Sequence, residues 1–187
     1  MIFRLFQRNR QDATIRALYG AIVAQARQAV FYAEYDVPDT VEGRLDMIML
    51  HISLFFARVR TDRLTRALGQ GVFDLFCQDV DHNFREMGIG DLAVPKRMQR
   101  VAEAFYGRAA AYDAALETSE DELLTAALAR NIFAHTQQPQ GAPRLASYVR
   151  KAVEHLANQA GQDFARGILT FPNPHTISVT ISPPRTV

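Results

Sequence analysis

Apolar residues along most of this chain recur every three to four positions, which is the spacing of amphipathic α-helices. Between residues 41 and 60 the pattern is denser, and apolar side chains fall on almost every side of the expected helix. A helix that is apolar all round is typical of a buried position, so we expect this one at the centre of the fold. Its polar exceptions are Asp46 and His51. Each should be hydrogen-bonded in the core or at its rim, because a buried charge without a partner is costly.

Signals for helix starts and stops divide the rest of the chain. Asp12 is a candidate N-cap, Asp39 and Ser119 open capping boxes with a glutamate three residues later, and Pro38 and Pro143 mark a stop and a start. The expected helices cover about residues 12–35, 41–60, 61–68, 72–87, 95–116, 119–135, 144–160 and 162–169. Two of these segments are only a turn or two long, so the predicted fold is all-α, a single bundle of about six or seven helices.

Residues 72–116 are expected to form an αα-hairpin. Gly88 suits the left-handed position just past a helix end, and Pro95 suits the first turn of the next helix. Gly90 and Asp91 add further turn residues to the connection. Such a connection is either a tight structural corner or a docking surface.

A glycine also interrupts the second helix of this hairpin. Gly107 lies in mid-helix, where glycine costs about 1 kcal/mol relative to alanine. Either a close contact between helices or access for a partner would compensate for that cost.

The two ends of the chain differ from its middle, and we divide the sequence into an N-terminal segment (1–11), a helical domain (12–170) and a proline-rich tail (171–187). The first segment interleaves apolar and basic residues, which is typical either of a turn packed on the domain or of contact with lipid headgroups. The candidate membrane-contact residues are Ile2, Phe3, Arg4 and Phe6. The tail alternates apolar and polar residues around Val179, which is the pattern of a strand. We expect this segment to lie extended across the helices; pairing with the same tail of another chain or with a sheet edge of a partner is the alternative.

Composition and charge narrow the function classes. The formal net charge is only +1, so the overall electrostatic potential does not favour binding of nucleic acid. Cys77 is the only cysteine, so no intramolecular disulfide is expected. We expect no specific nucleic-acid partner and no cofactor. The most apolar run is much shorter than the ~20 residues of a membrane span, and the N-terminal apolar run is too short for a secretory signal. We therefore expect a cytoplasmic location. Peripheral contact with the inner face of the cytoplasmic membrane is an additional possibility.

One polar face of the hairpin carries groups that could do chemistry. His82 has Asp79 three residues before it and Glu86 four residues after it, so all three lie on one side of the expected helix. They could ligate a metal or support acid–base catalysis in a helical enzyme. The simpler interpretations are a solvated face with i,i+4 pairs or a docking face. The sequence has no second copy of the motif, no nucleophile motif and no phosphate-binding loop, so we predict no catalytic residues and no metal ligands.

Two long strings carry a family resemblance. REMGIGDLAVPKRM, followed by AFYGR, spans residues 85–108, and LYGAIVAQARQAVFYAEYDVPDTVEGRLDMIMLH spans residues 18–51. Together with their spacing they cover about residues 15–135 and resemble the ubiquinol–cytochrome c chaperone family, which assists assembly of the cytochrome bc complex (respiratory complex III). We identify the chain as resembling a bacterial member.

The resemblance implies a non-catalytic assembly chaperone that binds newly made cytochrome b as its client. In mitochondrial members a second assembly factor and the ribosome are further partners. The open alternatives are a helical enzyme or metal-binding protein using Asp79, His82 and Glu86, and a membrane-surface adaptor. The matched strings imply a partner-binding surface made of Asp81, His82, Arg85, Glu86, Gly88, Gly90, Asp91, Lys96, Tyr106 and Arg108.

Overall fold

All regular secondary structure in the described part of the chain is helical. The structure is a computed structural model that describes residues 2–63, 65–134, 136 and 139–177, with side chains from residue 10 onward. Its helices are α1 (Ile2–Ala26), α2 (Ala29–Ala33), α3 (Val41–Val59), α4 (Arg66–Glu86), α5 (Val94–Leu116), α6 (Asp121–Ile132), α7 (Ala142–Asn158), α8 (Gly161–Ala165) and the 3-10 turn η1 (Pro174–Thr176). The predicted all-α bundle is confirmed.

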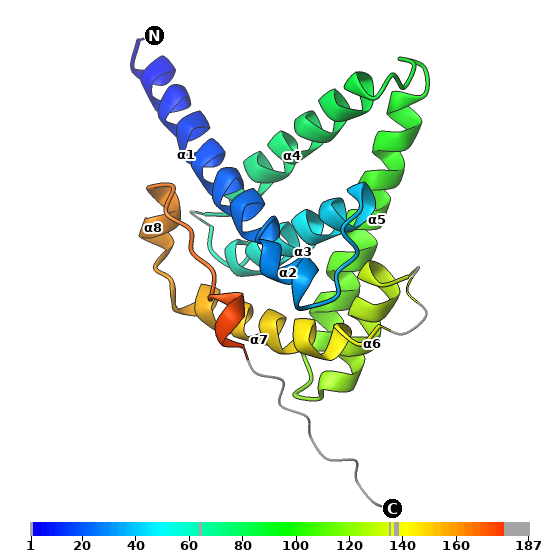
Figure 1. The fold of residues 1–187 in the computed structure, drawn as a ribbon. Coiled ribbons are helices and arrows are strands. Elements are labelled where there is room, and N and C mark those ends of the chain that lie inside the picture. The colour runs from blue at the N-terminus through cyan, green and yellow to red at the C-terminus, as the bar shows by residue number, and fades with distance from the viewer. Residues whose placement is uncertain (1, 64, 135, 137–138, 178–187) are drawn as a thin grey trace, which may run out of the picture.

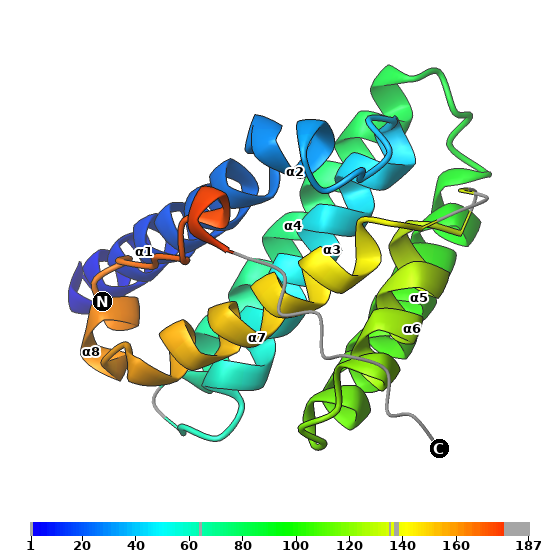
Figure 2. The same ribbon diagram turned by 60° about the horizontal axis from the view of Figure 1, so that its bottom comes forward.

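Helix α3 is the central element of the bundle. It packs against α1, α4, α5, α6 and α7, and in Figure 2 it lies behind α7 with α5 and α6 to one side. Its fully buried side chains include Met47, Leu50, Ile52 and Phe55. The dense apolar pattern of residues 41–60 therefore reflects burial on several sides, as predicted.

Two arms diverge from the bundle: the N-terminal part of α1 and the hairpin of α4 and α5 (Figure 1). The arms meet where the Tyr19 hydroxyl donates to Asp79 Oδ2 at 2.8 Å. Ile15 also packs against Gly71 of α4. A side chain at position 71 would clash, because its Cβ would lie 2.3 Å from Ile15 Cδ1. Beyond these contacts, the N-terminal part of α1 and the C-terminal part of α4 separate, so the loop of the hairpin lies far from the core.

The hydrogen-bonded core of the bundle centres on His51. Its Nδ1 lies 2.8 Å from the Met47 carbonyl oxygen and its Nε2 lies 2.8 Å from the Tyr148 hydroxyl. Gln25 Nε2 donates to the same hydroxyl at 3.0 Å. Complete burial lowers the pKa of His51 to about 4, so the imidazole is neutral. The expectation that His51 is satisfied within the core is confirmed.

Helix α1 begins earlier than its predicted start. The predicted N-cap, Asp12, lies within a helix that already begins at Ile2, so that prediction is wrong. Residues 2–11 contain neither glycine nor proline, and nothing in their sequence interrupts a helix.

Two further caps differ from the predicted ones. Thr40, rather than Asp39, caps α3 by accepting from the Gly43 backbone N–H at 3.0 Å, while Asp39 pairs with Arg44 at 2.6 Å. Helix α6 begins after Glu120 without a side-chain cap, so the capping role predicted for Ser119 is wrong. Pro143 does lie in the first turn of α7.

The tail begins by binding the first helices. The Tyr35 hydroxyl donates to the Pro174 carbonyl at 2.6 Å, and Gln25 Nε2 donates to the Pro172 carbonyl at 3.2 Å. Residues 172–174 thus lie against α1 and α2, and the 3-10 turn η1 follows from Pro174. The alternating pattern around Val179 lies outside the described residues, and the division of the chain at residues 11 and 170 stays a prediction.

Candidate functional site

The α4–α5 loop has the geometry that its glycines predict. Gly88 has a φ of +77°, a left-handed conformation that favours glycine. Its N–H donates to the Arg85 carbonyl at 3.0 Å, and the Ile89 N–H donates to the Phe84 carbonyl at 3.1 Å. These bonds satisfy carbonyls at the end of α4. Pro95 lies in the first turn of α5, as predicted.

An arginine ties the loop to the end of α4. Arg85 Nε lies 2.7 Å from Asp81 Oδ2 and its terminal guanidinium nitrogen lies 2.5 Å from Asp91 Oδ1. The hydrogen bond from Arg85 lowers the pKa of Asp81, and the same bond raises the pKa of Arg85. All three side chains are solvent-exposed to a large extent, so this bridge orients the loop more than it stabilises the fold.

In the described part of the chain, the polar face of α4 does not gather its three candidate groups into a metal centre. His82 Nε2 pairs with Glu86 Oε1 at 3.1 Å on the exposed side of α4. Asp79 instead accepts a hydrogen bond from Tyr19 of α1. Within the described ranges, no three His, Cys, Asp or Glu side chains are grouped as metal ligands. The metal site considered from the sequence is therefore not formed by Asp79, His82 and Glu86.

Exposed apolar side chains at the tip of the hairpin were not expected from the sequence. Leu92 is 98% exposed and Met87 is 62% exposed. Lys96 is also exposed just beyond them, near the start of α5. Leu92 lies in the loop between Gly90 and Pro95, outside either helical repeat, so periodicity could not assign it to the core or to the surface.

Tyr106 and Arg108 lie away from the loop and on different sides of α5. Tyr106 is 54% exposed, and its ring centroid lies 5.5 Å from that of Phe73 on α4. Arg108 instead points to α3 and forms an ion pair with Asp46, and both side chains are mostly buried. The expected bonding of Asp46 at the core rim is confirmed. The residues of the predicted surface therefore lie in three places: at and near the hairpin loop, at Tyr106 beside Phe73, and at Arg108, which pairs with Asp46.

Arg108 and Asp46 line a groove between α3, α5 and α6. Its volume is about 500 Å³, within the range typical of ligand clefts. The apolar walls come from all three helices and from the loop before α3. The lining residues are Pro38, Thr40, Glu42, Gly43, Leu45, Asp46, Met49, Arg100, Val101, Ala104, Arg108, Arg130, Asn131, Ile132 and Ala134.

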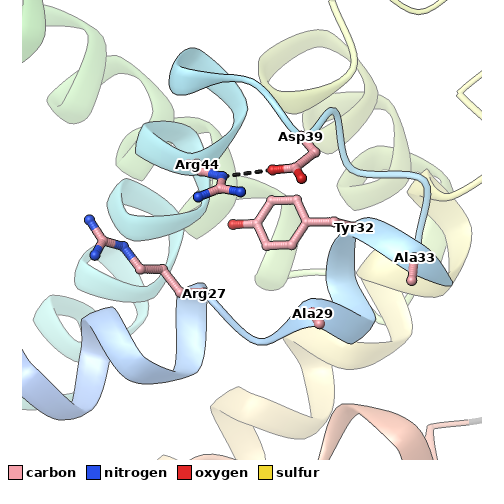
Figure 3. A pocket seen from close by; sticks show the side chains of 6 residues that line it. All are labelled: Arg27, Ala29, Tyr32, Ala33, Asp39 and Arg44. Atoms are coloured by element: carbon pink, nitrogen blue, oxygen red, sulfur yellow. Dashed lines mark hydrogen bonds and ion pairs between the residues drawn. The ribbon is translucent and has the colours of Figure 1, made fainter.

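A second cavity, of about 400 Å³, lies beside α2 (Figure 3). Arg44 pairs with Asp39, and its guanidinium lies 5.7 Å from the centroid of the Tyr32 ring. The Tyr32 hydroxyl donates to the Ala26 carbonyl at 2.8 Å. Most polar groups of this cavity thus already have protein partners.

Known proteins resemble this chain over most of its length. The sequence profile described as ubiquinol-cytochrome C chaperone matches residues 33–171. The chain belongs to this family. A crystal structure of the Cbp3 homolog from Brucella abortus matches with a TM-score of 0.86 and 40% identity, covering 95% of this chain and 100% of that one. The family predicted from the sequence is confirmed, and the fold agrees with it.

Two vertebrate relatives have names that state a role. The ubiquinol-cytochrome-c reductase complex assembly factors 1 of Xenopus laevis and Homo sapiens are each 26% identical to 78% of this chain. The match covers 74% of the frog protein but 49% of the human one. In the described part of this family member, none of the helices is long and apolar enough to cross a membrane. The side chains of Ile2, Phe3, Arg4 and Phe6 lie outside the described part.

Proposed function

We propose that this family member is an assembly factor of respiratory complex III that binds newly made cytochrome b and does not catalyse a reaction. The family and the names of its relatives support the role in complex III assembly. The choice of cytochrome b as client comes from the resemblance of the two matched strings. A second assembly factor and the ribosome remain proposed partners, and the proposed working place is the cytoplasmic face of the membrane.

The observation that carries the binding role is the apolar tip of the hairpin arm. Leu92 and Met87 are exposed at the end of two helices that project from the bundle. A contiguous apolar patch rimmed by polar side chains is typical of surfaces that bind other proteins, and we propose that Met87 and Leu92 form the centre of such a patch. Here Arg85 and Glu86 lie beside the tip and would add charge-assisted contacts at its rim.

Site-specific photo-cross-linking in cells that make complex III tests this function. A photoreactive amino acid replaces Leu92 in one variant and Leu123 in the control, because Leu123 is also exposed, at 52%, but lies on α6. We expect an adduct with cytochrome b from position 92 and none from position 123. Equal adducts from both positions, or no cytochrome b adduct from position 92, would contradict the proposal.

A further inference from the structure

We propose that the groove between α3, α5 and α6 binds an apolar peptide segment of a partner protein through a carboxylate on that segment, which pairs with Arg100 and Arg130. This inference rests on the proposed function, since it adds a second and chemically selective contact to the client surface. Its two proposed carboxylate contacts, Arg100 and Arg130, were assigned to binding neither by the sequence pattern nor by the matched strings.

The groove has a regular construction. Arg100, Ala104 and Arg108 are spaced four residues apart and therefore form one stripe along α5. On α3, the facing residues include Leu45 and Met49, which are also one turn apart. Two helices thus present matched stripes with apolar centres, which suits the side chains of an inserted peptide.

Only some of the charged side chains in the groove have a partner within the protein. Arg108 is already paired with Asp46 at the base. Arg100 and Arg130 also line the groove, but neither forms a hydrogen bond or ion pair with any described residue. The remaining charged lining residue is Glu42, in the first turn of α3. Both guanidinium groups are exposed beside an apolar floor, so they are accessible to a ligand that combines apolar side chains with a carboxylate.

The groove also continues the proposed client surface. Helix α5 begins at Val94, directly after the hairpin tip, and Arg100 lies less than two turns further along the same helix. A client that contacts Leu92 can therefore reach the groove along α5. We commit to a peptide as the occupant because of this continuity with the proposed protein-binding tip.

An array of short overlapping peptides covering cytochrome b and the other complex III subunits tests the inference with the full-length chain. The groove variant is Arg100→Glu with Arg130→Glu. The matched control is Arg16→Glu with Arg166→Glu, which makes the same change in net charge at two exposed positions elsewhere. Circular dichroism melting curves verify that both variants fold.

We expect the wild type and the control to capture apolar peptides that contain Asp or Glu. Because a lost charge-assisted contact weakens binding about tenfold or more, the groove variant should lose these peptides, and changing the acid to Gln should weaken wild-type binding equally. Changing the acid to Lys should restore binding to the groove variant, measured as Kd by fluorescence anisotropy.

Three outcomes would overturn the inference: no peptide captured, capture that is insensitive to Arg100 and Arg130, or loss in the groove variant of binding to phosphatidylglycerol vesicles instead of peptides. Failure of the client proposal is a different result. If position 92 cross-links only to another complex III subunit and the charge-dependent peptides come from that subunit, cytochrome b is the wrong client and the groove assignment stands.

Discussion

Acidification should destabilise this protein through one buried histidine. The Met47 carbonyl can only accept, so His51 Nδ1 carries the proton and donates to it, and Nε2 accepts from the Tyr148 hydroxyl. The hydroxyl oxygen in turn accepts from Gln25 Nε2. This chain of hydrogen bonds is complete only while His51 is neutral. A second proton, on Nε2, would point at the Tyr148 hydroxyl, which already donates its own hydrogen to Nε2.

The size of the effect follows from the pKa of His51. Burial lowers this pKa from 6.5 to about 4. Between these values the unfolded chain binds more protons than the folded protein, so the free energy of unfolding rises with pH. The whole difference corresponds to about 3 kcal/mol, and about 2 kcal/mol of it should be lost between pH 7 and pH 5.

Urea unfolding at several pH values measures this loss, with His51→Gln as the comparison. Glutamine can donate to the Met47 carbonyl and accept from Tyr148, but it does not titrate. The wild type should lose about 2 kcal/mol more than the variant between pH 7 and pH 5. Equal losses in the two proteins would refute the assignment of a neutral, buried His51.

Three further changes probe individual contacts. Among the described residues, the buried Tyr112 hydroxyl makes no hydrogen bond of good geometry, and neither does the neighbouring Asn131 side-chain nitrogen, so Tyr112→Phe should change the free energy of unfolding by less than about 1 kcal/mol in urea titrations; a larger loss would show that the hydroxyl does bond to Asn131. Gly88→Ala, at a φ of +77°, should cost about 1 kcal/mol in thermal melting, and no change would contradict the loop geometry. Asp46→Ala leaves Arg108 partly buried and unpaired, which should cost about 1–3 kcal/mol. Adding Arg108→Met should recover part of that loss, and no recovery would argue against the pair.

Local patterns predicted most of the helices, because their signals lie within a few residues of one another. The single helix expected over residues 12–35 is instead divided into α1 and α2, and the short helix expected over 61–68 begins only at Arg66, as the first turn of α4. The apolar density of residues 41–60 identified the central helix, and Gly88 with Pro95 located the hairpin connection. Caps were less predictable: Asp39 and Thr40 are both good N-cap residues, and the choice depends on the ion pair of Asp39 with Arg44.

The candidate site was harder to predict because it depends on contacts between distant segments. Asp46 and Arg108 are 62 residues apart in sequence, and no periodic pattern connects them. The groove exists only where three helices pack together. The close helix contact considered for Gly107 is absent among the described residues, since no atom of another helix lies within 4 Å of where its Cβ would be. Access for a partner at Gly107 stays a prediction.

The central claim is that this chain promotes complex III assembly through its hairpin tip. Reduced-minus-oxidised haem spectra of membranes from a deletion strain test it most directly, after complementation with wild type, Leu92→Asp or the control Leu123→Asp. Because both leucines are largely exposed, both variants should fold. We predict selective loss of the b-type haem signal in the deletion strain, restored by wild type and Leu123→Asp but not by Leu92→Asp. An unchanged b-type signal in the deletion strain, or full restoration by Leu92→Asp, would contradict the claim.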